Sequence, residues 1–339
     1  GPHYEGGLSI DNYGNSYNGA WRLNADLDIN NPLQAGDRLS LRALVSDEAQ
    51  HYLRGQYELP MGPWATRAGA AYSWMDYELG KDFEVLESTG TAGIATLYVV
   101  QPWWRQRQYG FSTQLAFDNK RLQDETGLFG LDSQKSLNNL SLQFNGYWRD
   151  QLLGGASTSY SLGWTAGDLS LDSRDAEVQD VLLRSAGKFQ KWAPALYRQQ
   201  LLASNLTLLL QARGQIASGN LDSAEKVSLG GAYGVRAYPE GEASGDEGWV
   251  ANAEFRYALD EVWQAGFFLD AGGVTVNKNP VPGAGDNHRQ LSGLGLAVYW
   301  QPDMHWQATV SAAWPISNDD PTSDTPRGNY IWGQLAWRY

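Results

Sequence analysis

The sequence predicts an all-β protein, a transmembrane antiparallel β-barrel of about 16 strands. Three observations support this fold class. Apolar and polar residues alternate along segments of roughly ten residues, Trp (15) and Tyr (18) outnumber Phe (9), and short connections alternate with long polar ones. The mean hydropathy is −0.46, and no run approaches the ~18 apolar residues that a spanning helix needs. A barrel is compatible with both observations, because only every second residue of each strand faces lipid.

The segment "WRLNADLDI" at residues 21–29 shows the alternation plainly, with apolar residues at its odd positions and polar or charged residues at its even ones. Residues 140–148 and 206–216 repeat the pattern. A soluble β-sandwich also alternates, but its strands are usually about 5–6 residues long, whereas about ten residues cross a bilayer at a tilt. The length of these segments therefore favours a membrane barrel.

Alternation and turn residues together place sixteen strands along the chain. We expect the tenth strand to end near Pro194, because proline cannot donate to a β-ladder. The long polar connections would be extracellular loops and the short ones periplasmic turns, and an even strand number puts both termini on the periplasmic side. The expected strands are roughly residues 5–12, 18–30, 37–46, 49–59, 64–77, 91–101, 107–119, 136–149, 155–166, 182–193, 201–218, 248–259, 262–274, 290–300, 306–315 and 329–339.

Composition and motifs argue against several other functions. A net charge of −13 and a pI near 4.7 are unsuited to a nucleic-acid binder held by phosphate contacts. Cysteine is absent, and the four histidines are scattered without metal-ligand spacing. We find no catalytic motif in a fitting context, so we expect no enzyme activity, no metal site and no cofactor.

The stretch "GGAYGVRAYPEGEASGDEGW" at residues 230–249 holds a single cation, Arg236, among glycines and carboxylates. With the following "VANAEFRYAL" and "GFFLDAGGV", it resembles the two-partner secretion transporters of the hemolysin activation/secretion family. That family carries a V-R-G-[YF] tetrad at the tip of its sixth extracellular loop, which folds back into the barrel lumen. Here the tetrad reads Val235, Arg236, Ala237 and Tyr238, with alanine where glycine is usual. Alanine is less comfortable than glycine at positive φ.

An arginine inside the lumen needs carboxylate partners that face inward. In "ANAEFRYAL" the apolar face is odd-numbered, which turns Glu254 toward the lumen, and the next strand turns Asp270 inward in the same way. The family resemblance likewise implies that the tetrad's arginine meets acidic residues on these two strands. The last strand, "YIWGQLAWRY", alternates and ends on Trp337 and Tyr339, which resembles the C-terminal signal read by the barrel assembly machinery.

The resemblance implies a function and a set of partners. It implies a Gram-negative outer-membrane pore that exports a large unfolded exoprotein (a toxin, adhesin or hemolysin) in two-partner, or type V, secretion. Its partners would be that exoprotein, the lipid bilayer and, during biogenesis, the assembly machinery, and we expect a monomer. Residues 1–339 would form the barrel domain, which in the family follows a plug helix and two periplasmic POTRA domains. The alternatives are an assembly insertase of the same superfamily and a general diffusion porin.

Overall fold

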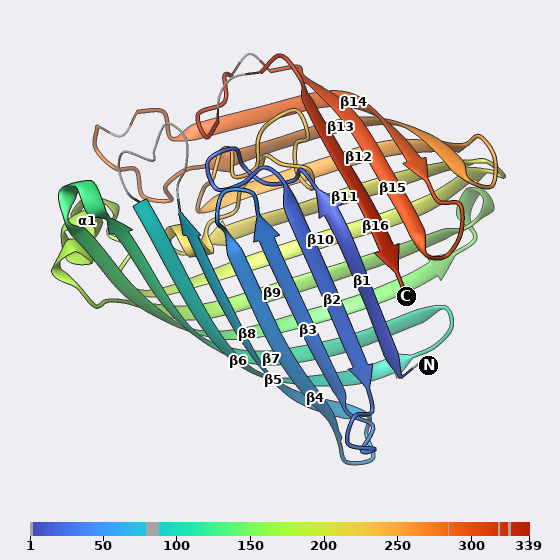
Figure 1. Ribbon diagram of the computed structural model, residues 1–339, viewed down its shortest axis with the longest axis horizontal. Coiled ribbons are helices and arrows are strands. Elements are labelled where there is room, and N and C mark those ends of the chain that lie inside the picture. The colour runs from blue at the N-terminus through green and yellow to red at the C-terminus, as the bar shows by residue number, and fades with distance from the viewer. Residues whose placement is uncertain (1–2, 79–87, 284, 318, 325–326) are drawn as a thin grey trace.

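The computed structural model describes residues 3–78, 88–283, 285–317, 319–324 and 327–339, and it forms a closed antiparallel barrel of sixteen strands (Figure 1). Each strand pairs with its neighbours in sequence, and β1 closes the ring against β16. The predicted fold class is thereby confirmed. The strands are β1 (Tyr4–Asp11), β2 (Arg22–Asn30), β3 (Arg38–Ser46), β4 (His51–Met61), β5 (Thr66–Glu78), β6 (Ser88–Arg105), β7 (Tyr109–Thr126), β8 (Leu131–Asp150), β9 (Ala156–Leu171), β10 (Gly187–Ala203), β11 (Leu206–Ala217), β12 (Glu247–Ala258), β13 (Trp263–Thr275), β14 (His288–Trp300), β15 (Trp306–Pro315) and β16 (Tyr330–Arg338).

The two faces of the strands follow the sequence alternation. On β2, Leu23 and Leu27 point outward and are exposed, whereas Asp28 points inward and pairs with Arg38 of β3. Among the described residues, no helix is both long and apolar enough to span a membrane. The apolar outer face of the strands is the surface that a bilayer would cover.

The strands from β6 to β10 are longer than the apolar–polar alternation predicts, so this part of the barrel wall is taller. Residues 119–136, expected as a loop, lie largely in β7 and β8, which are joined by the short 3-10 turn η2 (Gly127–Phe129). Beyond the bilayer both faces of a strand meet water, so the apolar–polar period disappears while backbone pairing continues. The sequence signal therefore ends before the strand does.

The tenth strand differs most from its predicted bounds. Residues 174–183 form the helix α1 (Arg174–Leu183), capped by the Ser173 side chain, and β10 begins only at Gly187. Pro194 lies within this strand opposite Leu162, and the ladder to β11 is interrupted beside it, between the Trp192 and Ala195 pairs. The expected range of 182–193 was wrong because the proline occupies a break in the ladder rather than the strand end.

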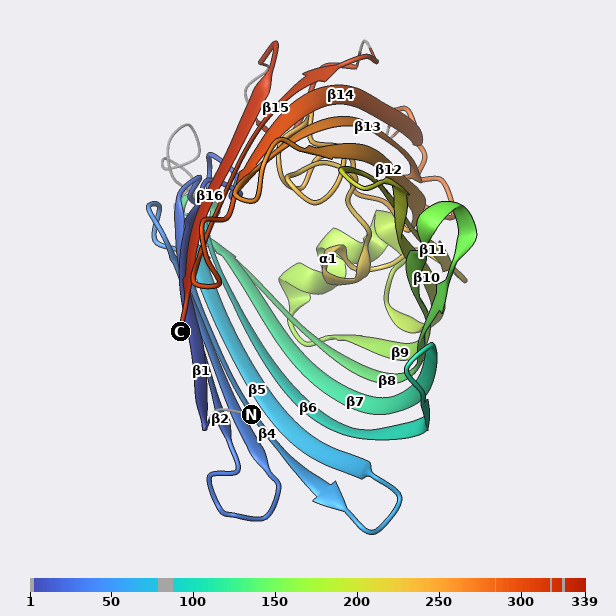
Figure 2. The same ribbon diagram turned by 90° about the vertical axis from the view of Figure 1, so that its right-hand side faces the viewer.

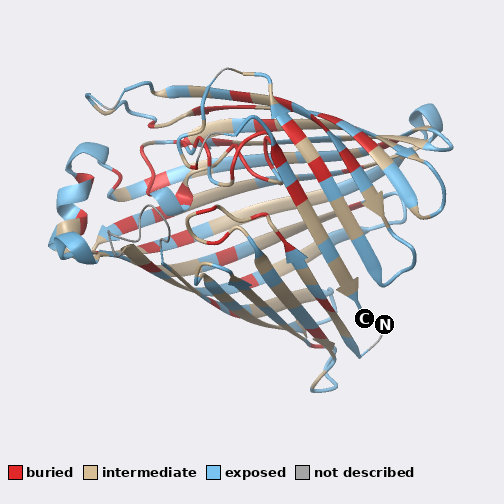
Figure 3. Ribbon diagram, turned by 45° about the horizontal axis from the view of Figure 1, so that its top comes forward, coloured by how far each residue is buried: buried red, intermediate tan, exposed pale blue. Residues whose placement is uncertain are grey.

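The ladder that closes the ring, between β1 and β16, is the shortest in the described structure. Five residue pairs join β1 to β16, from Gly7–Arg338 to Asp11–Gln334, whereas eighteen join β7 to β8. Both termini lie at the same end of the barrel (Figure 1). A large group of buried apolar residues gathers where the segment 218–246, between β11 and β12, meets β12–β14, and Figure 3 shows this concentration of burial.

Candidate functional site: a loop fastened to the inner wall

The segment 218–246, called loop 6 below, is drawn inside the ring of strands in Figure 2. Its tip is a tight double bend. The Val235 N–H donates to the Leu229 carbonyl at 2.7 Å, and Gly231 takes a φ of 109°, which favours glycine. A Cβ on Gly230 would lie 2.2 Å from the Pro239 carbonyl oxygen. The glycines of this stretch therefore permit backbone segments to pass closer than side chains would allow.

Arg236 forms ion pairs with two carboxylates at this tip. Its Nε and Nη2 donate to the two oxygens of Asp270, both at 2.8 Å, and its Nη1 donates to Glu254 Oε2 at 2.7 Å. Its backbone N–H donates to Asp270 as well, at 3.1 Å. The side chains of Arg236, Glu254 and Asp270 are 12%, 7% and 0% exposed, so the three charges meet in a dry environment. A planar guanidinium suits this forked arrangement, which lysine cannot reproduce.

The electrostatics keep Arg236 charged. Burial alone would lower the pKa of its guanidinium, but Asp270 and Glu254 outweigh that effect and raise it above its usual value. The Arg236 Cζ also lies 3.3 Å from the centre of the fully buried Phe268 ring, a cation–π contact. The site is thus a permanent positive charge enclosed by two anions and one aromatic face.

Further side chains hold these groups in place. Asn252 donates to both the Gly234 carbonyl and Asp270, each at 2.8 Å, and the hydroxyl of Tyr299 donates to Glu254. The Trp332 indole N–H of β16 donates to the Arg236 carbonyl at 2.7 Å. The roles of Phe268, Tyr299 and Trp332 were missed from the sequence. The strand alternation could have indicated them, because it places each of these aromatic residues on the inward face of its strand.

The other tetrad residues pack around the arginine. Val235, Ala237 and Tyr238 are at most 1% exposed, and the Tyr238 hydroxyl lies 2.7 Å from Ser317 Oγ. Ala237 is not among the described residues with positive φ, so alanine is unstrained there. A Cβ on Gly293 of β14 would lie 2.4 Å from the Ala237 Cβ. The glycine at Gly293 thus supplies the space that the Ala237 methyl group occupies.

The returning limb of the loop has its own buried charge. Glu242 is fully buried and accepts hydrogen bonds from Arg289 of β14 and from Thr322 and Ser323, whose backbone N–H groups donate at 2.9 and 2.8 Å. Burial alone would raise the pKa of the Glu242 carboxyl, but the contacts with Ser323 and Arg289 lower it overall. No family motif on the sequence pointed to this residue.

The structure does not bring Trp337 and Tyr339 to this site. Trp337 pairs with Leu8 of β1 at the end of the barrel that holds both termini, and the Tyr339 N–H donates to the Gly6 carbonyl at 2.9 Å. In the described parts of the chain, no three histidine or acidic side chains are grouped as metal ligands. The arrangement around Arg236 is a rigid latch between a loop and the wall.

Comparisons with known proteins cover most of the chain. The model of the family described as haemolysin secretion/activation protein ShlB/FhaC/HecB matches residues 1–299. The heme/hemopexin transporter protein HuxB of Haemophilus influenzae (strain 86-028NP) is 28% identical over 327 residues, 94% of this chain and 57% of HuxB. The outer membrane transporter CdiB of Dickeya dadantii is 26% identical over 339 residues, 93% of this chain and 57% of CdiB. The chain thus spans 57% of the length of these relatives.

Solved structures show the same fold. CdiB from Escherichia coli superposes with a TM-score of 0.79 at 19% identity, covering 100% of this chain and 63% of that one. BamA from Haemophilus ducreyi gives 0.67 at 14% identity, covering 99% and 70%. These two likenesses concern the fold, whereas the family match covers most of the sequence. The chain belongs to the ShlB/FhaC/HecB family of haemolysin secretion/activation proteins.

Proposed function

We propose that this chain is the pore through which a large unfolded partner protein crosses the outer membrane in two-partner secretion. The chain is an outer-membrane β-barrel of a secretion family. The observation that carries the proposal is the latch, in which Arg236 reaches the inward-facing Glu254 and Asp270 instead of solvent.

The lumen has the chemistry that such transport needs. Inward-facing charges such as Asp26 and Arg42 remain 47% and 45% exposed, so a hydrated surface lines part of the passage. Conduction requires contacts that are favourable enough to admit a substrate and weak enough to release it. An unfolded polypeptide would cross such a surface without being trapped, and its folding outside would give the movement a direction.

The partners follow from the same proposal. HuxB is named for heme and hemopexin transport and CdiB for outer-membrane transport, so we assign the substrate only as a secreted exoprotein. We propose that periplasmic POTRA domains capture this substrate and that the barrel acts as a monomer. We also propose that the barrel assembly machinery reads the C-terminal strand, which presents the exposed Tyr339.

Deletion and complementation test the function. Cells lacking the gene should retain the exoprotein encoded beside it, and the complete wild-type transporter should restore its release into the medium. Arg236→Ala in the complete transporter should abolish release while the barrel still folds. Unchanged release after deletion would refute the proposal. Loss of many unrelated outer-membrane proteins would instead favour an insertase, and loss of small-solute uptake a porin.

A further inference from the structure

The first limb of loop 6 is fastened to a different wall from its tip. Glu225 accepts from Lys120 of β7 at 2.6 Å and from Lys191 of β10 at 2.8 Å, and the Asn139 amide of β8 adds a third bond at 2.8 Å. Asp222 pairs with Lys135 of β8 at 2.9 Å. These contacts, called the root anchor below, tie the loop to β7, β8 and β10, whereas Arg236 at the tip bonds to β12, β13 and β16.

Apolar packing reinforces the root anchor. Leu221 is 2% exposed and packs with Leu137, Leu169 and Phe189, which project inward from β8, β9 and β10. Burial alone would raise the pKa of Glu225, but Lys191 and Lys120 lower it overall, so the carboxylate remains charged. The first limb of loop 6 is therefore held both by ion pairs and by a small cluster of buried apolar side chains.

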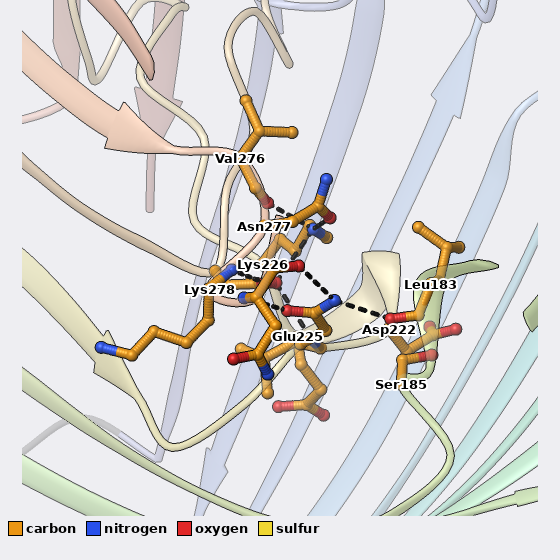
Figure 4. A network of polar contacts seen from close by, with 12 residues as sticks. Leu183, Ser185, Asp222, Glu225, Lys226, Val276, Asn277 and Lys278 are labelled. Atoms are coloured by element: carbon orange, nitrogen blue, oxygen red, sulfur yellow. Dashed lines mark hydrogen bonds and ion pairs between the residues drawn. The ribbon is translucent and has the colours of Figure 1, made fainter. Parts of the chain in front are cut away.

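A third set of contacts ties the two limbs together. Lys226 pairs with the fully buried Asp246 at 2.9 Å and donates to the Val276 carbonyl and to Asn277, as Figure 4 shows for its bonds to the segment after β13. With the tip on β12, β13 and β16 and the returning limb on β14, the loop is held along most of one side of the lumen.

The opposite side, formed by β3–β6, is left open. Within the described residues, no hydrogen bond or ion pair joins loop 6 to these four strands, whereas β2 and the segment before it approach the loop through Arg22 and Asn15. The inner face of β3–β6 is polar and wet: the Arg38 and Arg42 side chains are 44% and 45% exposed, and Thr96 donates to Asp118 of β7. Cations and anions are mixed along it, so an extended chain would meet charged and polar side chains there.

Resting on the function proposed above, we propose that the exported polypeptide crosses the barrel along the inner face of β3–β6 while loop 6 stays fastened to the other wall. The three sets of contacts on loop 6 would all have to break for the loop to leave. A polypeptide that passes along the uncovered strands requires no such rearrangement of loop 6. The substrate is an unfolded peptide chain that makes transient polar contacts with this face.

Two pairs of cysteine variants test the path, because the chain contains no cysteine of its own. Ser40→Cys on β3 and Thr96→Cys on β6 lie on the open face. Ser141→Cys on β8 and Thr165→Cys on β9 are their controls of matched chemistry, since the two hydroxyls lie 3.2 Å apart on the strands next to the root anchor and away from Arg236. A bulky charged thiol reagent is attached in denaturant so that every variant is fully modified before refolding, and single-channel conductance is then recorded.

We expect modification at Ser40→Cys or Thr96→Cys to lower conductance at least about twofold and to reduce blocking events caused by an added unstructured Gly/Ser/Lys peptide of about thirty residues. Modification at Ser141→Cys or Thr165→Cys should change neither. Equal or larger effects at the two controls would overturn the path, and so would a barrel that conducts nothing before modification. Neither result would touch the secretion test above, so the two proposals fail separately.

Discussion

The tip and the root of loop 6 are both held by charge, but in different ways. At the tip one guanidinium makes forked bonds to Asp270 and a further bond to Glu254, with all three side chains nearly excluded from water. At the root the carboxylate of Glu225 lies between two lysines whose side chains remain 17% and 16% exposed. The first arrangement depends on the shape of one side chain, and the second on net charge and apolar packing.

This difference predicts how each end responds to change. A forked, buried ion pair is costly to break, because Asp270, 0% exposed, would stay buried without its cation, although Glu254 keeps its ion pair with Arg256. A pair with partly solvated lysines loses less, since water reaches the groups left behind. Single-cysteine reporters can compare the two ends: Val235→Cys, 0% exposed, reports on the tip, and Leu221→Cys, 2% exposed, reports on the root.

Arg236→Ala should have the largest effect. Removing one partner of a buried pair typically costs about 3–5 kcal/mol, so thiol labelling of the Val235→Cys reporter should accelerate about a hundredfold or more. The Leu221→Cys reporter should barely change, because the root anchor persists. Arg236→Lys is the matched control for charge, and it should behave nearly like alanine because an ammonium cannot make the fork. Full protection of the tip in Arg236→Lys would show that charge alone suffices.

Gly293→Ala should have an intermediate effect, confined to the tip. The added methyl group would lie 2.4 Å from the Ala237 Cβ, and overpacking of this kind typically costs about 1–3 kcal/mol. Ala237→Gly in the same chain should restore protection of the Val235→Cys reporter by removing the opposing methyl group. A double variant labelled as fast as Gly293→Ala would show that the two positions do not compete for one space.

The sequence could predict the tip better than the root for a physical reason. Strand alternation turns Glu254 and Asp270 to the same side as the lumen, and the tetrad marks Arg236, so pattern and motif together name all three. Glu225 and Lys120 are 105 residues apart, and neither lies in a recognisable motif. Their meeting depends on how far loop 6 reaches across the barrel, which no local pattern encodes.

The same reasoning explains which parts of the fold were predictable. A bilayer imposes an apolar outer face, so alternation gave the number of strands and located all but the tenth, whose range was wrong. Above the bilayer that constraint ends, and the tall portions of β7 and β8 and the helix α1 escaped prediction. The root anchor lies against this tall wall, so the region that the pattern could not describe is also the region that holds the unpredicted contacts.

Glu225→Gln should have a smaller effect than either tip variant. It leaves Lys120 and Lys191 without their carboxylate but preserves the shape of the side chain and the packing of Leu137, Leu169 and Phe189, so labelling of the Leu221→Cys reporter should rise about tenfold at most. Glu247→Gln is the control, because Glu247 pairs with Lys278 at a site where both side chains are well exposed, 22% and 37%. Equal effects from the two substitutions would mean that the root ion pairs add nothing to the apolar packing.

Acidification should have the smallest effect of these changes, a gradual weakening of the root anchor as the pH falls. Lys191 and Lys120 hold the pKa of Glu225 below its ordinary value of 4.5, despite the opposing effect of burial. A carboxyl group with a lowered folded-state pKa contributes its full stabilisation above the ordinary value and loses it as the pH falls through the folded value. The root should therefore be unchanged between pH 7 and about 5 and should loosen progressively below about 4.5.

Labelling of the Leu221→Cys reporter, divided at each pH by its rate in the unfolded chain, measures this loosening. Glu225→Gln has no carboxylate to titrate at this position, so its root should lose most of the pH dependence. A Glu225→Gln root that loosens as steeply as the native one would show that the Glu225 carboxylate does not carry the acid response.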